Sequence, residues 1–270
     1  MLNPFVRWCR ARGGLWLLAL MLVSCGCPAG EVLTRVQASK TVRVCIWPDY
    51  YGISYRNPRT QQLEGLDIDL AKALGHDLGL RIEFVPSSFP TLQSDLLENR
   101  CDVGMFAIAM LPARTKVLRF ARVYLQSDIY AVTTRSSAVV RQWSDIDKPG
   151  VLVGVQPGTF MEPVMAAALK QARLVSVQPP LTRERELEAG RIDVFMTDYP
   201  YSRRLLDNAD WATLIAPPVP FHVLPYGHAV KPGDDAWFEV VDAFDARVQK
   251  DGRLVEIARR HGLDAIVVGD

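Results

Sequence analysis

The sequence predicts an α/β protein of two lobes, each a mostly parallel sheet flanked by helices, joined by a two-strand hinge. Three observations support this. Short β-rich runs alternate with helical runs from residue 41 onward, and the alternation restarts near residue 151. "LENRCDVGM" from Leu97 and "LEAGRIDVFM" from Leu187 stand at the same point of the two series. The 270 residues are 49% hydrophobic, enough for sizeable cores.

The first series contains three predicted strands and two helices. The strands are expected at 41–47 ("TVRVCIW"), 80–86 ("LRIEFVP") and 101–109 ("CDVGMFAIA"). The helices are expected at 65–79 ("GLDIDLAKALGHDLG"), which Gly79 closes, and at 91–100 ("TLQSDLLENR").

The second series has the same order. Strands are expected at 151–156 ("VLVGVQ"), 173–178 ("RLVSVQ") and 191–198 ("RIDVFMTD"). Helices are expected at 161–172 ("MEPVMAAALKQA") and 182–190 ("TRERELEAG"). Two similar units in series are therefore predicted.

The remaining segments connect the lobes. Residues 124–137 have strand-like composition and are expected to cross between lobes, and 221–230 ("FHVLPYGHAV") to return. Helices at 234–249 and 253–262 would then pack on the first lobe. This predicts lobe 1 from residues 40–128 plus 222–270, lobe 2 from residues 129–221, and a cleft that a hinge can close over a ligand.

The N-terminus, residues 1–24, reads as a signal peptide, with a basic start and then an apolar run too short to span a bilayer comfortably. "LVSC" resembles the bacterial lipobox, which would make Cys25 the lipidated first residue; cleavage after Ala29 and a core helix are the alternatives. Without Arg7, Arg10 and Arg12 of this leader the formal net charge of +1 becomes −2. We expect no nucleic-acid partner.

Export permits a disulfide, and Cys45 and Cys101 are the two cysteines next to predicted strands. Two buried thiols are the alternative. The sequence has no CxxC motif or Cys/His cluster, so structural zinc is not expected, and we expect no cofactor.

Ligands of open parallel α/β sheets bind beyond the carboxyl ends of the strands, and three groups of polar residues lie there. Arg114 offers a planar fork for a carboxylate, or is a surface arginine. Gly158 and Thr159 precede a helix and could bind an anion through backbone N–H groups and a hydroxyl, or cap the helix. Asp198 could hold an ammonium group or cap the next helix. Together they predict an α-amino acid ligand.

Aromatic residues follow the first two strands of the first series. Tyr50 and Phe89 are expected to cover the ligand side chain, whereas Trp47 and Tyr55 are expected in the core.

From about Lys40 onward the chain resembles the bacterial extracellular solute-binding proteins of family 3, the polar amino acid receptors of ABC importers. The resemblance rests on "LEGLDIDLAKAL", "LPAR", "LVGVQPGTF" and "RIDVFMTD", in this order. It implies a type II periplasmic-binding-protein fold. It also implies that Arg114 binds the α-carboxylate, that Thr159 assists, and that Asp198 binds the α-amino group. Aromatic residues near the positions of Tyr50 and Phe89 would then sandwich the ligand side chain.

The chain departs from the family pattern before the arginine. The family has a sequence close to "GMTITPER" where this chain has "AIAMLPAR", so Ala109 and Leu111 replace two threonines. This leaves room for a carboxylate ligand other than an ordinary amino acid. The expected ligand-binding residues are Tyr50, Phe89, Ala107, Ala109, Arg114, Gly158, Thr159, Phe160, Asp198 and Tyr201.

"DIDKPGV" and "LKQARLVSV" are similar to periplasmic cyclohexadienyl dehydratases, which share this fold. That resemblance implies a catalytic glutamate just past the "TD" motif, where this chain has Tyr201. Because a phenol is a poor general acid near neutral pH, we do not expect an enzyme.

The family resemblance therefore implies a periplasmic, lipid-tethered, monomeric binding protein that presents a small carboxylate-bearing solute to an ABC permease of the inner membrane. A dehydratase-like enzyme and a sensory or accessory binding protein are the alternatives.

Overall fold

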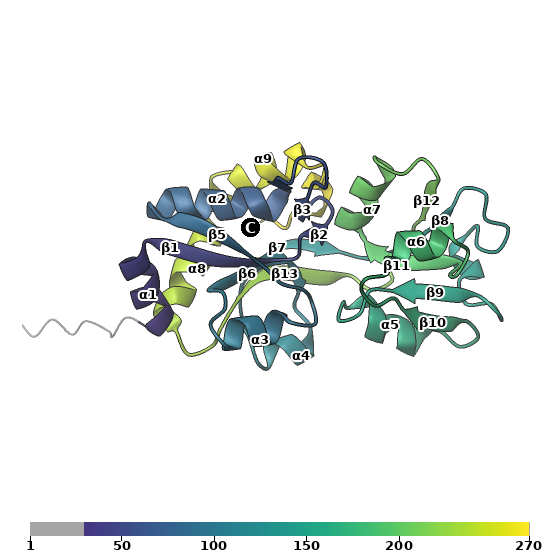
Figure 1. Ribbon diagram of the computed structural model, residues 1–270, viewed down its shortest axis with the longest axis horizontal. Helices are drawn as coiled ribbons and strands as arrows, with labels where there is room; N and C mark the ends of the chain where they lie inside the picture. Colours follow the sequence, from purple (N-terminus) through teal and green to yellow (C-terminus); the bar gives the residue numbers. More distant parts are fainter. Residues whose placement is uncertain (1–29, 270) are drawn as a thin grey trace, which may run out of the picture.

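The computed structural model describes residues 30–269, and these form two lobes side by side (Figure 1). Each lobe contains a five-stranded sheet. The strand order is β5-β1-β6-β13-β7 in lobe 1 and β10-β9-β11-β8-β12 in lobe 2. In each sheet three strands are joined by parallel pairing and the rest by antiparallel pairing. The predicted two-lobed α/β class is confirmed.

The strands of lobe 1 are β1 (Thr41–Ile46), β5 (Arg81–Pro86), β6 (Val103–Ala109), β7 (Arg119–Ser127) and β13 (Leu224–Val230). Its helices are α1 (Glu31–Ser39), α2 (Leu66–Leu78), α3 (Leu92–Leu97), α4 (Pro112–Thr115), α8 (Asp235–Lys250), α9 (Arg253–Arg260) and the 3-10 turn η2 (Asp264–Ile266). A small antiparallel sheet of β2 (Asp49–Tyr50), β3 (Ser54–Arg56) and β4 (Leu63–Glu64) precedes α2.

The strands of lobe 2 are β8 (Ile129–Thr134), β9 (Leu152–Val155), β10 (Arg173–Ser176), β11 (Val194–Asp198) and β12 (Ala212–Ile215). Its helices are the 3-10 turn η1 (Trp143–Asp145), α5 (Met161–Ala168), α6 (Arg183–Glu188) and α7 (Tyr199–Leu206).

The chain changes lobes between β7 and β8 and again between β12 and β13 (Figure 1). Helices α8 and α9 return to lobe 1, where the indole N–H of Trp237 donates to the carbonyl of Asp102 at 2.7 Å. None of the helices in the described part of the chain is both long and apolar enough to cross a membrane. The predicted leader and Cys25 lie outside the described residues.

The two similar segments that begin at Leu97 and Leu187 occupy equivalent places in the two lobes. The side chain of Asp102 accepts the backbone N–H of Arg43 on β1 at 2.7 Å, and that of Asp193 accepts the N–H of Leu152 on β9 at 2.8 Å. In both lobes the carboxylate that precedes β6 or β11 therefore ties that strand to the first strand of its series, β1 or β9.

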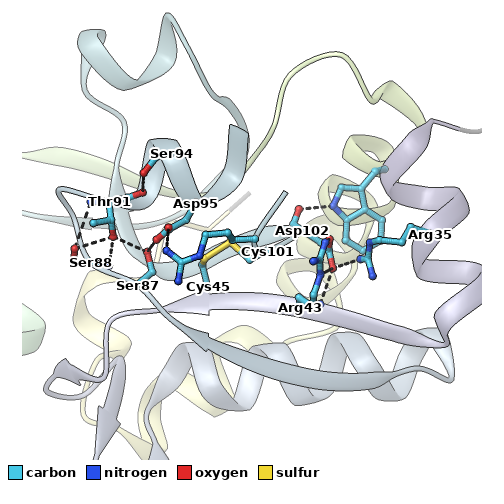
Figure 2. The surroundings of a disulfide bond; sticks show 12 residues. Arg35, Arg43, Cys45, Ser87, Ser88, Thr91, Ser94, Asp95, Cys101 and Asp102 are labelled. Atoms are coloured by element: carbon cyan, nitrogen blue, oxygen red, sulfur yellow. Dashed lines mark hydrogen bonds and ion pairs between the residues drawn. A yellow bond between two sulfur atoms is a disulfide. The ribbon is translucent and has the colours of Figure 1, made fainter. Parts of the chain in front are cut away.

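Cys45 and Cys101 form a disulfide that joins β1 to the turn before β6 (Figure 2). The bond closes a chain segment with a sequence separation of 56 residues. Loop-closure entropy in the unfolded chain makes such a bond worth roughly 4 kcal/mol. The disulfide thereby fixes the strand whose carboxyl end leads to Arg114.

Candidate ligand-binding cleft

A cavity lies between the two lobes. Residues of both lobes line it: Trp47, Tyr50, Phe89, Ala107, Ala109, Arg114, Thr159, Phe160, Met161, Arg183, Thr197, Asp198 and Tyr201. Nine of the ten predicted ligand-binding residues are in this set, and the tenth, Gly158, is adjacent to it. The fold thus brings together predicted residues that are far apart in the chain.

Arg114 lies in the short helix α4, which follows β6, and is 4% exposed. Its guanidinium donates to the carbonyl of Ala109 at 3.1 Å and, across the cleft, to the carbonyl of Gly158 at 2.7 Å. It also lies 5.2 Å from the centre of the Phe89 ring. Burial lowers the pKa of Arg114 to about 10, which leaves the group charged at neutral pH. Arg114 is thus not a surface arginine but a buried cation facing the cavity.

Asp198 ends β11 and is 2% exposed. Its carboxylate accepts hydrogen bonds from the hydroxyls of Tyr50 and Tyr226, the latter at 2.7 Å, and from the backbone N–H of Tyr201 at 3.2 Å. The last bond caps α7, so Asp198 both caps a helix and faces the cavity. Burial raises the pKa of Asp198, although these three donors oppose the shift. A cation brought to this carboxylate would offset the cost of burying it.

The turn at Gly158 and Thr159 differs from the expectation. The N–H of Gly158 donates to the Glu162 carboxylate at 3.0 Å, and the hydroxyl of Thr159 donates to the carbonyl of Gln156 at 2.7 Å. The prediction that this turn offers free donors to an anion was therefore wrong, because both donors have partners within the turn. Its carbonyl at Gly158 instead binds Arg114.

Aromatic rings close the cavity. Tyr50 and Phe89 lie 5.8 Å apart between ring centres, and Tyr201 from lobe 2 stacks on Trp47 at 6.4 Å. Trp47 was expected in the core and lines the cavity instead, because the chain turns into β2 directly after it. Tyr55 packs away from the cavity, against Tyr51 at 4.3 Å.

Ala107 has a φ of +47°, a conformation that residues with a Cβ rarely adopt. Its N–H donates to the buried carboxylate of Asp67 at 2.7 Å, and that carboxylate accepts the hydroxyl of Tyr124 at 2.8 Å. The buried carboxylate holds the strained residue against the cavity. Leu111, the other position where the family carries a hydroxyl, does not line the cavity, so the lost hydroxyl matters at Ala109.

Sequence reasoning missed Arg183, which begins α6 and is 3% exposed. Its guanidinium donates to the carbonyl of Met196 at 2.8 Å and lies 4.6 Å from the centre of the Tyr201 ring. In "TRERELEAG" it reads as one of several charged residues on a helix surface, so no local signal marks it. Met161 and Thr197 were also missed.

Fold and site define a two-lobed α/β protein with a charged cavity between its lobes. Residues 42–264 match the bacterial extracellular solute-binding proteins, family 3, and the chain belongs to that family.

Among proteins of known function, the chain is 30% identical over 217 residues to the cyclohexadienyl dehydratase of Pseudomonas aeruginosa, covering 78% of this chain and 81% of that protein. It is 23% identical over 208 residues to the ABC transporter glutamine-binding protein GlnH of Bacillus subtilis, covering 76% of this chain and 75% of that protein.

Among solved structures, the ancestral amino acid-binding protein AncCDT-1, a precursor of cyclohexadienyl dehydratase, matches with a TM-score of 0.77 and 27% identity, covering 84% of this chain and 97% of that one. The arginine-bound substrate-binding protein AbpA of Streptococcus pneumoniae matches with a TM-score of 0.77 and 21% identity, covering 86% of this chain and 99% of that one, which shows the shared fold.

Proposed function

We propose that the protein is a periplasmic solute-binding protein that closes its lobes on a small carboxylate-bearing solute, an amino acid, and presents it to an ABC permease. The observation that carries this proposal is the Arg114 guanidinium, which is buried in the interlobe cavity with two backbone carbonyls as its polar partners. A carboxylate would supply the missing countercharge in a bidentate geometry. Asp198 would receive the ammonium group of the same ligand.

The closed arrangement also supports binding by lobe closure. Arg114 of lobe 1 bonds to Gly158 of lobe 2, and Tyr50 of lobe 1 bonds to Asp198 of lobe 2. A ligand inserted between the two lobes would replace these direct interlobe hydrogen bonds with bonds to the ligand from each lobe. Lobe closure would then depend on the ligand.

The test is a thermal-shift and calorimetric screen of amino acids and small carboxylates on the mature protein. A ligand present at 100 times its Kd should stabilise the fold by about 2.7 kcal/mol. Arg114→Met should weaken binding about 100-fold, because a buried charge-assisted pair is lost. Arg173→Met, at an exposed position on β10, is the matched control and should bind normally. If Arg114→Met binds as tightly as the native protein, Arg114 is not the carboxylate anchor.

The 30% identity to a cyclohexadienyl dehydratase makes an enzyme the second candidate. Burial raises the pKa of Tyr201 well above its usual value, and its hydroxyl donates to Glu184 at 2.6 Å. Such a phenol remains protonated and is a weak general acid. We expect no turnover of prephenate or arogenate above the uncatalysed rate, measured by chromatography. Turnover that Tyr201→Phe abolishes would establish the enzyme instead.

We further propose that residues 1–24 direct export, that Cys25 carries the lipid that tethers the protein, and that the protein is monomeric. Mass spectrometry of the protein purified from membranes would detect the lipid, and light scattering would give the mass. A soluble form starting at residue 30 would indicate ordinary cleavage after Ala29 instead.

A further inference from the structure

The cavity contains more positive than negative charge. Its lining includes three charged side chains: Arg114, Arg183 and Asp198. Each is at most 4% exposed. A zwitterionic ligand brings one charge of each sign and leaves the excess positive charge in place. Because an uncompensated buried charge costs several kcal/mol, the excess calls for a further anion.

Arg183 is the cation that a simple amino acid would leave without a carboxylate. Among residues 30–269 neither Arg114 nor Arg183 is in an ion pair, and the hydrogen-bond partners of both are backbone carbonyls. The Arg183 guanidinium contacts two rings, 5.1 Å from the centre of Phe195 and 4.6 Å from that of Tyr201. The Arg183 side chain also lines the cavity.

The nearby carboxylates are already engaged. Asp198 accepts two tyrosine hydroxyls and one backbone N–H, so Arg183 acts on it through space without a direct bond. Glu184 accepts the hydroxyl of Tyr201 at 2.6 Å and is partly exposed. Neither carboxylate is within ion-pair distance of Arg183, although both lie on lobe 2.

We infer that the ligand carries a second carboxylate, which Arg183 binds. This inference rests on the proposed function, in which Arg114 and Asp198 hold the α-carboxylate and the α-ammonium group. The ligand class is then an α-amino acid with an acidic side chain. The same charges disfavour amino acids with cationic side chains, such as the arginine bound to the structural relative AbpA.

The experiment compares isosteric pairs of amino acids, because acid and amide differ in charge but hardly in shape. Calorimetry would measure the Kd of glutamate against glutamine and of aspartate against asparagine, with arginine as the cationic probe. We expect the native protein to prefer the acid of at least one pair by tenfold or more, and to bind arginine weakest.

Variants distinguish the binding role of Arg114 from that of Arg183. Arg183→Met should bring the acid-to-amide ratio of affinities to about one, and Arg183→Lys should restore part of the preference. Arg114→Met should weaken binding of acid and amide alike.

Two results would overturn the inference. If the native protein binds the amide or arginine as tightly as the acid, and binding still requires Arg114, the proposed function stands and the second carboxylate is rejected. If none of these amino acids binds but another compound of the wider screen does, the second carboxylate is rejected and the proposed function stands; if no compound of that screen binds, both are rejected. The ratio of acid to amide affinities in the native protein tests the second carboxylate even if the Arg183 variants fail to fold.

Discussion

The buried charges of lobe 1 and those of the interlobe cavity differ in whether the fold supplies their countercharges. In lobe 1 the ring of His228 lies between two carboxylates, with Nδ1 2.9 Å from Asp245 and Nε2 3.5 Å from Asp67. Tyr124 donates its hydroxyl to Asp67 as well. All four side chains are nearly inaccessible to water. This group, hereafter the His228 cluster, contains its own countercharges.

The cavity is built in the opposite way. Its two guanidiniums donate to backbone carbonyls and have no ion-pair partner within residues 30–269. A buried charged group whose countercharge belongs to the fold contributes to stability. A buried charged group without a countercharge instead provides binding energy for a ligand. The contrast explains why burial alone does not identify a functional site, while burial without a countercharge does.

The largest effect should come from breaking the His228 cluster. His228→Leu leaves the carboxylates of Asp67 and Asp245 buried without their cation, which should lower the free energy of unfolding by about 4 kcal/mol. Urea unfolding measures this. Arg260→Ala, which removes a surface ion pair with Asp69, is the control and should cost less than about 1 kcal/mol. A loss below about 1 kcal/mol for His228→Leu would show that the cluster is not structural.

The same cluster should make stability depend on pH. Burial opposes the charge of His228, but Asp245 and Asp67 outweigh it and raise the pKa to about 10. Because the folded pKa lies above the unfolded value of 6.5, the stabilisation is complete below about pH 6.5 and is lost as pH rises toward 10. We expect a loss on the order of 2–3 kcal/mol between pH 7 and 10 in urea titrations. His228→Leu should lack this part of the slope; an unchanged slope would exclude His228 as its source.

Ala107 connects the two regions, since its N–H binds Asp67 of the cluster and its side chain lines the cavity. At a φ of +47° glycine is favoured over alanine. Ala107→Gly should therefore raise the free energy of unfolding by up to about 1 kcal/mol. Ala71→Gly, inside α2, is a control and should destabilise the protein. If Ala107→Gly also destabilises by more than about 1 kcal/mol, packing of the methyl group outweighs the strain.

The sequence was sufficient to predict the features of the fold and site that depend on local sequence pattern. Alternating strands and helices predicted both series, and the position of a residue just past a strand end predicted Arg114 and Asp198. Arg114 follows β6 of lobe 1 and Asp198 ends β11 of lobe 2, and the two residues meet because both strands end at the cavity between the lobes. Gly79 ends α2 in the left-handed conformation, as its position predicted.

The features that depend on contacts between residues far apart in the sequence could not be predicted. His228 and Asp67 are 161 residues apart in the sequence, and each reads as an ordinary strand or helix residue. Arg183 becomes buried because α7 places Tyr201 over it, a contact that "TRERELEAG" does not encode. The donors at Gly158 and Thr159 were misjudged for the same reason, because Glu162 and Gln156 satisfy them only in the folded turn.

The smallest effect on stability should come from the cavity, and it is the sharpest test of the contrast. In Arg114→Met, losing the bonds to Ala109 and Gly158 is offset by removing a buried cation that has no countercharge. The free energy of unfolding of ligand-free protein, refolded from urea and dialysed, should therefore change by less than about 1 kcal/mol. Stabilisation by an added ligand should disappear in the same variant. A loss of 3 kcal/mol or more without ligand would make Arg114 a structural cation like His228, and the distinction between the two regions would fail.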